Sequence, residues 1–186
     1  MCRQCGGKLD LLKPGRVPSY CSTRCRVAAH RSRSAVPAEL ERRDRWVSWK
    51  PVRRGGKVTK MPVQADGSAA SSTDSGTWAP YRSVRGAARL GFVLGEGIGC
   101  IDLDHCLIDG KPTTAAAAFL ARMPKTYIEV SPSGDGLHVW GLMPEGPGSR
   151  RTVGGLNVET YSVGRYITVT GKPFEGSVPR LADLPT

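Results

Sequence analysis

Two aspartates, Asp102 and Asp104, end an apolar stretch (GFVLGEGIGCIDLD) that is typical of a buried strand. Alternate side chains of a strand share a face, so the two carboxylates project together and repel each other unless a cation compensates them. Carboxylate oxygens are the ligands that Mg²⁺ and Mn²⁺ prefer. The flanking Cys100, His105 and Cys106 keep zinc open as another candidate, and two acids exposed on an edge strand would need no metal.

A turn rich in small residues follows in the segment SPSGDGLHVW. Ser133, Gly134 and Gly136 predict a turn whose backbone N–H groups can bind phosphate. His138 begins the next strand, where its imidazole can reach the same anion. We therefore predict a phosphate-binding turn here, although a lone histidine is more often structural.

The segment NVETYSVGRYITVTGKP adds a third carboxylate and a cation. Glu159 follows an apolar strand residue and can join the aspartate pair, because two-metal phosphoryl-transfer sites usually use a third carboxylate. Arg165 lies near it on the return strand. The simpler interpretation is an ordinary cross-strand ion pair between Glu159 and Arg165, which would contribute little stability.

Four cysteines near the N-terminus have zinc-site spacing, as Cys2-x2-Cys5 and Cys21-x3-Cys25. Tetrahedral zinc takes four ligands, and two close pairs supply two from each chain segment. The stretch YCSTRCRVAAHRSR predicts a helix that begins near Ser22 with Cys25 in its first turn. Arginines on this helix predict a nucleic-acid-binding face, with a merely solvated helix as the alternative. These arginines are Arg24, Arg26, Arg31 and Arg33.

The overall composition favours a basic protein that binds a polyanion. The 186 residues carry a formal net charge of +11, and residues 1–60 hold 16 of the 27 Lys and Arg against four acids. This asymmetry favours a nucleic-acid face over a uniformly basic shell. No apolar run approaches a membrane span, and the polar N-terminus is not a secretory signal. We expect a cytoplasmic protein without a membrane partner, with its cysteines reduced or bound to metal.

These residues must be positioned by strands and helices. The strands and helices expected along the sequence predict an α+β fold with an antiparallel or mixed sheet and two or three helices. Residues 1–34 are expected to form a small module stapled by zinc, residues 35–45 a linker, and residues 46–186 the catalytic domain. Segment 46–63 reads as a hairpin, and helices are expected over 80–90 and 113–123. Two further hairpins are expected: one joins GFVLGEG to IGCIDLD, and one turns around Val163 and Gly164.

The order of these motifs resembles the primase–polymerase domains of the archaeo-eukaryotic primase superfamily, and most of all the phage and plasmid branch of bifunctional primase/polymerase proteins. The resemblance rests on D-x-D, then S-G-x-G-x-H, then a strand glutamate followed by R-Y-x-T-V-T-G, and it covers about Trp46 to Gly171. Supporting pieces are W-x-x-W-K-P, Lys60 with Pro62, Thr77-Trp78, and G-F-V-L before the aspartates.

The resemblance implies a role for each site residue and a small catalytic domain whose sheet is RRM-like in part. Asp102, Asp104 and Glu159 would hold two Mg²⁺ or Mn²⁺ ions for template-directed nucleotidyl transfer, while zinc would be structural. Ser133 and His138 would match the nucleotide-binding motif, with His138 on the triphosphate. Arg165 and Tyr166 would line the nucleotide pocket; these two residues are assigned through the resemblance.

The implied function is a DNA primase and DNA polymerase of phage, plasmid or prophage replication. Its expected partners are single-stranded DNA template, nucleoside triphosphates and a separate replicative helicase. Two alternatives stay open at this point. One is a non-catalytic, zinc-dependent DNA-binding replication protein whose D-x-D hairpin is structural, and the other is a metal-dependent nuclease that uses the same carboxylates.

Overall fold

A computed structural model of the protein describes residues 2, 8–9, 18–31 and 36–185. The chain divides into two units, Met1–Ser34 and Ala35–Thr186. Each unit is described by itself. None of the helices in the described ranges is long and apolar enough to span a membrane.

The described residues of the first unit include the helix α1 (Thr23–Arg31). Ser22 caps its start, because the Ser22 hydroxyl accepts a hydrogen bond from the Cys25 backbone N–H at 3.1 Å. The predicted helix start near Ser22 is therefore confirmed. Among the residues predicted to act in this unit, Cys5, Arg33 and the side chain of Arg31 lie outside the described part of the chain.

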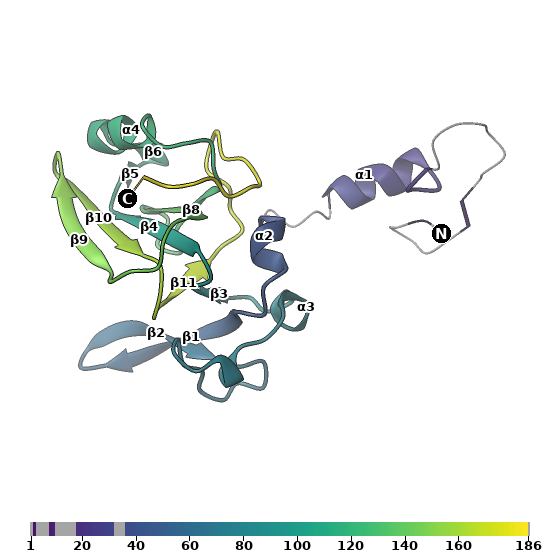
Figure 1. Cartoon of the computed structure of the whole chain (residues 1–186), viewed down its shortest axis with the longest axis horizontal. Helices are drawn as coiled ribbons and strands as arrows, with labels where there is room; N and C mark the ends of the chain where they lie inside the picture. Colours follow the sequence, from purple (N-terminus) through teal and green to yellow (C-terminus); the bar gives the residue numbers. More distant parts are fainter. Residues whose placement is uncertain (1, 3–7, 10–17, 32–35, 186) are drawn as a thin grey trace. The chain divides into compact units, whose positions relative to one another are not determined.

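The second unit contains two antiparallel sheets and a short two-stranded ladder (Figure 1). The first sheet has the order β11-β3-β1-β2, with strands β1 (Trp46–Arg54), β2 (Lys57–Val63), β3 (Leu90–Val93) and β11 (Tyr166–Val169). The second sheet has the order β7-β8-β4-β10-β9, with strands β4 (Ile98–Asp104), β7 (Ile128–Val130), β8 (Leu137–Leu142), β9 (Ser149–Val153) and β10 (Leu156–Tyr161). The ladder pairs β5 (Leu107–Ile108) with β6 (Lys111–Pro112).

The helices of this unit are few and short: α2 (Ala38–Glu41), α3 (Tyr81–Val84), α4 (Thr114–Leu120) and the 3-10 turn η1 (Ser75–Thr77). Thr113 caps α4 by accepting a hydrogen bond from the Ala116 N–H at 3.3 Å, as its Thr-Ala-rich sequence predicts. The predicted helix over 80–90 extends over only one turn, α3. The α+β prediction is confirmed, since antiparallel strands dominate the described fold.

Two apolar clusters form the core. One joins the two sheets through large aromatic side chains, with Trp46 and Phe92 from the first sheet and Trp140 from the second. The other covers the opposite face of the second sheet and includes Val139 of β8 and Phe119 of α4. The second sheet therefore has one face buried under α4, and its other face turns toward the first sheet.

The segment 35–45 was predicted as a linker, yet part of it belongs to the core of the second unit. Val36 and Leu40 are buried in the cluster between the sheets. The Trp46 indole N–H donates to the Leu40 backbone oxygen at 3.0 Å, which fixes α2 against the start of β1. The sequence A-E-L-E places one leucine in this short turn, and burial of that leucine holds the segment to the sheet.

The two hairpins predicted between β3 and β4 and between β10 and β11 are wrong, and this difference changes which strands lie beside Asp102. β3 pairs with β1 and β11, whereas β4 pairs with β8 and β10, so β3 and β4 belong to different sheets. β10 and β11 are likewise consecutive strands of different sheets. Both connections cross between the sheets because the apolar residues around them, such as Leu94 and Ile98, are buried in the shared cluster. As a result β10 lies beside β4.

Candidate active site

A row of charged and titratable side chains crosses the second sheet on the face turned away from α4. The backbone register pairs neighbouring strands residue by residue, in the order Glu129, His138, Asp102, Glu159 and Arg150. Residues paired in this way share a face of the sheet and lie within contact distance. The structure thus brings together Asp102, His138 and Glu159, which are far apart in the sequence.

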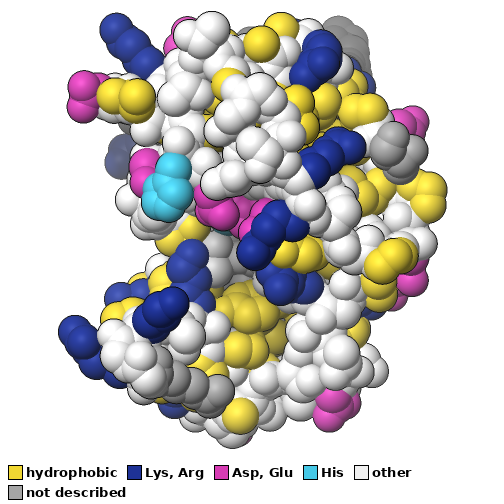
Figure 2. All heavy atoms as spheres, turned by 90° about the vertical axis from the view of Figure 1, so that its left-hand side faces the viewer, with side chains coloured by type: hydrophobic (Ala, Val, Ile, Leu, Met, Phe, Trp, Pro, Cys, Tyr) yellow, Lys and Arg dark blue, Asp and Glu magenta, His cyan; other side chains and the backbone are white. Residues whose placement is uncertain are grey.

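This row opens into a cleft of about 500 Å³ between the two sheets. Asp102 and His138 line one wall, and residues of β2, of the loop at Ser72 and of the β11 region line the other. That second set comprises Lys60, Pro62, Ser72, Gly164, Arg165, Tyr166, Ile167 and Thr168. Figure 2 shows the hollow, with acidic and basic side chains meeting at its edge.

His138 is held in place by a fully buried carboxylate. Its Nδ1 lies 3.2 Å from Glu129 Oε1, and its Nε2 lies 3.8 Å from Asp102 Oδ1. A carboxylate only accepts hydrogen bonds, so the Nδ1 of His138 carries a proton and its Nε2 faces Asp102. Glu129 therefore fixes which ring nitrogen His138 presents to the cleft.

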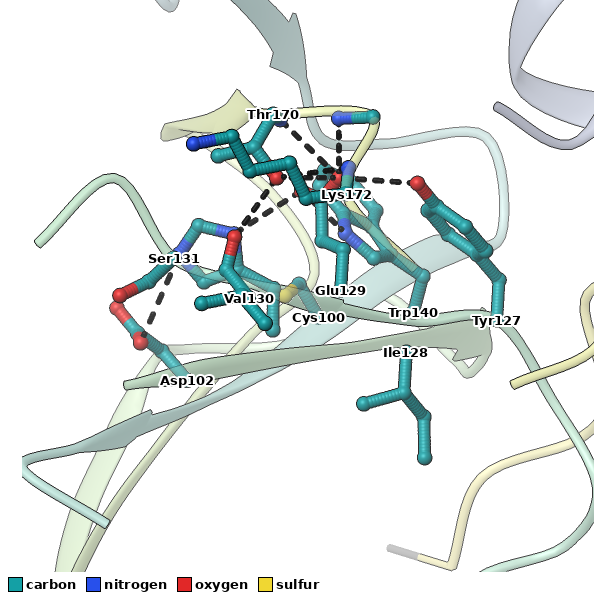
Figure 3. Close-up of polar contacts among 12 residues, drawn as sticks. Cys100, Asp102, Tyr127, Ile128, Glu129, Val130, Ser131, Trp140, Thr170 and Lys172 are labelled. Carbon is teal, nitrogen blue, oxygen red and sulfur yellow. Dashed lines mark hydrogen bonds and ion pairs between the residues drawn. The ribbon is translucent and has the colours of Figure 1, made fainter. Parts of the chain in front are cut away.

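Glu129 accepts further hydrogen bonds from groups around it (Figure 3). The donors include the Tyr127 hydroxyl at 3.0 Å, the Trp140 indole N–H at 3.3 Å and the Gly171 backbone N–H at 2.9 Å. Both the backbone N–H and the hydroxyl of Thr170 also donate to it, at 3.1 and 3.2 Å. This carboxylate links β7 and β8 to the segment after β11, and its many donors explain how it tolerates complete burial.

The carboxyl group of Asp102 lies in an environment that disfavours its charge. Burial raises the pKa of Asp102, and the carboxylates of Asp104 and Glu159 raise it further, whereas His138 and Lys60 lower it. Asp104 is exposed at the end of β4. A hard divalent cation bound to the Asp102 carboxylate would stabilise its charged form.

Glu159 is engaged by side chains of its own sheet and of the β11 region. The Arg150 guanidinium forms an ion pair with it, and the Tyr161 hydroxyl donates to it at 2.5 Å. Arg165 Nη1 lies 3.9 Å from the same carboxylate and 52% of its side chain is exposed. The Arg165 guanidinium also stacks on Tyr161, with its carbon 4.1 Å from the ring centroid. Two arginines thus contact Glu159, and one of them, Arg165, also lines the cleft.

Tyr166, predicted to line the nucleotide pocket, contributes to the cleft wall together with Arg165. Its hydroxyl donates to the Lys60 backbone oxygen at 2.5 Å, and burial raises its pKa to about 12. The ring packs on Gly91, where an added Cβ would lie 2.6 Å from a ring carbon. A glycine is needed at position 91 to let the tyrosine form this wall.

The predicted phosphate-binding turn lies beside the end of β4 and is not among the residues that line the cleft. Gly136 packs against β4, since a Cβ there would be 2.8 Å from the Leu103 backbone oxygen. The Gly134 N–H donates to the Ser131 oxygen, and the Ser133 hydroxyl donates to Asp135 at 2.5 Å. The turn is thus held by internal hydrogen bonds, and its phosphate-binding role stays a prediction.

The cysteine sulfurs separate into two kinds of environment. Cys2, Cys21 and Cys25 have their sulfur atoms within 4.8 Å of one another, the one set of three potential metal ligands gathered this closely among the described residues. The Cys21 and Cys25 sulfurs are 3.5 Å apart, close to the spacing of about 3.8 Å that tetrahedral zinc–thiolate geometry gives. The described part of the first unit therefore fits a zinc ion.

The two cysteines beside the aspartates are buried in different clusters. Cys100 belongs to the cluster between the sheets and Cys106 to the one under α4. Strand alternation predicts both cysteines on the same side of β4 as the aspartates. Cys100 lies on that side, but Cys106 does not, because β4 ends at Asp104 and the chain turns at His105, whose φ is 48°. Burial raises the pKa of Cys100, and the Asp102 and Glu129 carboxylates raise it further. A protonated, buried thiol is a poor zinc ligand.

Sequence reasoning missed Glu129, Arg150 and Tyr161 as members of this site, and it noted Lys60 only as part of a motif. A signal for Glu129 does exist, because an acid inside the apolar strand Y-I-E-V needs buried partners. Arg150 and Tyr161 carry no comparable signal, since their contacts depend on the register of β9, β10 and β4.

Comparison with known proteins gives two matches. A family model described as bifunctional DNA primase/polymerase, N-terminal, matches residues 27–183. A DNA primase-polymerase of Nitratiruptor phage NrS-1 is 39% identical over 156 residues, which cover 76% of this chain and 21% of that protein. The chain therefore spans about a fifth of the length of this curated relative.

Proposed function

Because this chain belongs to the bifunctional DNA primase/polymerase family, we propose that it transfers nucleotides to a 3′-hydroxyl on a single-stranded DNA template. The observation that carries the proposal is the row of Asp102, His138 and Glu159. Asp102 and His138 of this row line a cleft that Lys60 and Arg165 also line. Carboxylates beside cations in one cleft suit a reaction between a triphosphate and a hydroxyl, in which positioning and charge provide most of the catalysis.

In this proposal the chain's own cations bind the triphosphate. Arg165 and Lys60 face the cleft and would neutralise phosphate charge during pyrophosphate release, and His138 would join them once its Nε2 takes up a proton beside the bound triphosphate. Arg150 is next to Glu159 and 75% of its side chain is exposed, so it can turn from the carboxylate toward an incoming anion. Gly164 and Tyr166 shape the wall against which the nucleotide would lie.

The carboxylates would hold the metal that the family's chemistry requires. Asp102 and Asp104 on β4 and Glu159 on β10 provide the oxygen donors, with Glu159 exchanging its contact with Arg150 for the ion. When bound, Mg²⁺ or Mn²⁺ as a pair would activate the attacking oxygen and stabilise the leaving pyrophosphate. The Ser133–Gly136 turn would bind phosphate through backbone N–H groups other than that of Gly134, which donates to the Ser131 oxygen.

The proposed reaction is tested by incubating the full chain with unprimed single-stranded DNA and either ribo- or deoxynucleoside triphosphates, with Mg²⁺ or Mn²⁺. We expect products longer than the first dinucleotide, resolved by size on a denaturing gel. Binding of DNA without any incorporation would favour the non-catalytic alternative. Shortened template that forms without nucleoside triphosphates would identify a nuclease instead.

We also propose that Cys2, Cys5, Cys21 and Cys25 bind one structural zinc ion. Replacing Cys21 or Cys25 with serine is expected to lower the zinc content from about one ion per chain to a small fraction. Elemental analysis of the purified protein measures this. Asp102→Asn serves as the control and should keep its zinc; equal zinc content in all three variants would show that the ion is not held by this cluster.

The arginines of α1 would hold template near the zinc module, and a separate replicative helicase would open the duplex ahead of synthesis. The DNA template and the nucleoside triphosphates occur in the cytoplasm of a bacterial host, where the protein would act.

A further inference from the structure

The β1–β2 hairpin is the most basic element of the second unit. Residues 46–63 contain five Lys or Arg and no acid. Lys50, Arg53, Lys57 and Lys60 are all exposed. Lys and Arg side chains gather in the lower part of Figure 2, where this hairpin lies. So concentrated a charge attracts a polyanion, but charge by itself does not say which face binds.

The register of the hairpin divides its side chains between two faces. Trp49 pairs with Pro62, Pro51 with Lys60, and Arg53 with Val58, so these residues share one face. The other face carries the pairs Ser48–Val63, Lys50–Met61 and Val52–Thr59, followed by Lys57. Lys60 and Pro62 of the first face line the cleft. The first face therefore runs from the candidate active site outward along the hairpin to Arg53.

This cleft-side face combines an aromatic ring with cations and exposed apolar surface. Trp49 is half-buried, with Lys60 Nζ 5.7 Å and the Arg89 guanidinium carbon 5.3 Å from its ring centroid. Val58 is 59% exposed at the outer end of the face. Single-stranded nucleic acids bind such surfaces by stacking bases on aromatic rings while cations follow the phosphates. A duplex would offer its phosphates but no unpaired base to the ring.

We propose that the face formed by Trp49, Arg53, Val58 and Lys60 binds the single-stranded DNA template as it enters the cleft. The inference rests on the proposed function, because it identifies the surface that delivers the template to that site. It places the template contact within the catalytic unit, in addition to any contact made by the arginines of α1.

The two faces allow a matched test with the full-length chain. Arg53→Gln and Lys57→Gln remove one charge each from opposite faces of the same hairpin. Binding of a fluorescent oligo-dT is measured by anisotropy over a range of salt concentrations. Arg53→Gln should reduce the slope of log K against log salt by about 1, as expected for one lost phosphate contact, whereas Lys57→Gln should leave it unchanged.

Trp49→Ala tests the stacking contact separately. We expect binding weaker by about 5- to 150-fold with an unchanged salt slope, and Trp49→Phe should recover most of the affinity because it keeps a ring. Equal slope changes for Arg53→Gln and Lys57→Gln would overturn the assignment to one face. Wild-type affinity in both Arg53→Gln and Trp49→Ala would overturn it too, as would a duplex that competes as well as a single strand.

Failure of the proposed function gives a different pattern. Asp102→Asn should bind the oligonucleotide like the wild type while its incorporation rate falls by about a thousandfold or more. If the wild type also incorporates nothing but shows the face-dependent binding, the catalytic proposal is wrong and the binding surface stands.

Discussion

Asp102→Asn is expected to lower the rate of nucleotide incorporation by about a thousandfold or more. Asparagine keeps the size of the side chain but removes the charge that would hold a divalent cation opposite Glu159. Loss of metal-based stabilisation of the transition state costs several kcal/mol, and about 4 kcal/mol corresponds to a thousandfold. Single-turnover incorporation with saturating nucleotide measures the chemical step directly.

The same substitution should leave the fold intact or make it more stable. Burial and the carboxylates of Asp104 and Glu159 raise the pKa of Asp102, so its charged form is unfavourable where it stands. A neutral side chain removes this repulsion, although it also weakens the contact with His138. We expect the free energy of unfolding to change by less than about 1 kcal/mol.

Asp109→Asn is the matched control. Asp109 is exposed between β5 and β6 with a φ of 51°, a conformation that asparagine adopts easily. This variant should incorporate nucleotides at the wild-type rate. Incorporation by Asp102→Asn at more than about a tenth of the wild-type rate would show that Asp102 is not a metal ligand, since one charge removed from a metal site has a larger effect.

The sequence predicts the strands of this fold better than it predicts their partners. Apolar residues in alternation predict β4, β8 and β10. Because alternate side chains of a strand share a face, the sequence also places Asp102 and Asp104 correctly on one face of β4. The same local pattern is compatible with a hairpin or with a crossing to a second sheet. Burial of Leu94 and Ile98 between the sheets favours the connection that crosses from one sheet to the other. This burial depends on residues far away in the sequence, so a short segment does not predict it.

The residues of the candidate site, like the strands, are easier to predict from the sequence than their arrangement in space. Residue types and order point to Asp102, His138 and Glu159, but their alignment in one row depends on the register of three strands. Arg150 and Tyr161 contact Glu159 because of that register, so no local sequence motif predicts these contacts. The cysteine spacing, in contrast, predicts correctly that the sulfurs of Cys2, Cys21 and Cys25 lie close together, while Cys5 lies outside the described residues.

Glu129→Gln is expected to reduce both stability and activity, although Glu129 does not line the cleft. The two oxygens of the carboxylate face donors on both sides: His138 and Trp140 at Oε1, and the Tyr127 hydroxyl with the Thr170–Gly171 segment at Oε2. A glutamine must turn its NH2 group toward one of these sets, so donors face donors in a buried site. We expect the free energy of unfolding to fall by about 3 kcal/mol.

The effect on activity follows from the position of His138. Without a full acceptor at Nδ1 the imidazole is free to rotate or to change tautomer, and Nε2 no longer faces Asp102 at 3.8 Å. Misplacement of a phosphate-binding group by about 1 Å can cost roughly a hundredfold in rate. We therefore expect incorporation to fall about ten- to a hundredfold at a temperature where the variant is folded, as urea denaturation would verify.

Tyr127→Phe separates positioning from general destabilisation. It removes one donor to Glu129 on the side away from His138 and should cost only about 1 kcal/mol of stability, with incorporation close to the wild-type rate. The ¹⁵N shifts of the His138 ring give a second readout, because the two tautomers differ there. They should report an Nδ1 proton in the wild type and in Tyr127→Phe, and a mixture in Glu129→Gln. A Glu129→Gln protein with the wild-type tautomer and rate would show that the buried carboxylate supports the fold alone, whereas a changed tautomer together with the slower rate would make Glu129 the residue that orients His138.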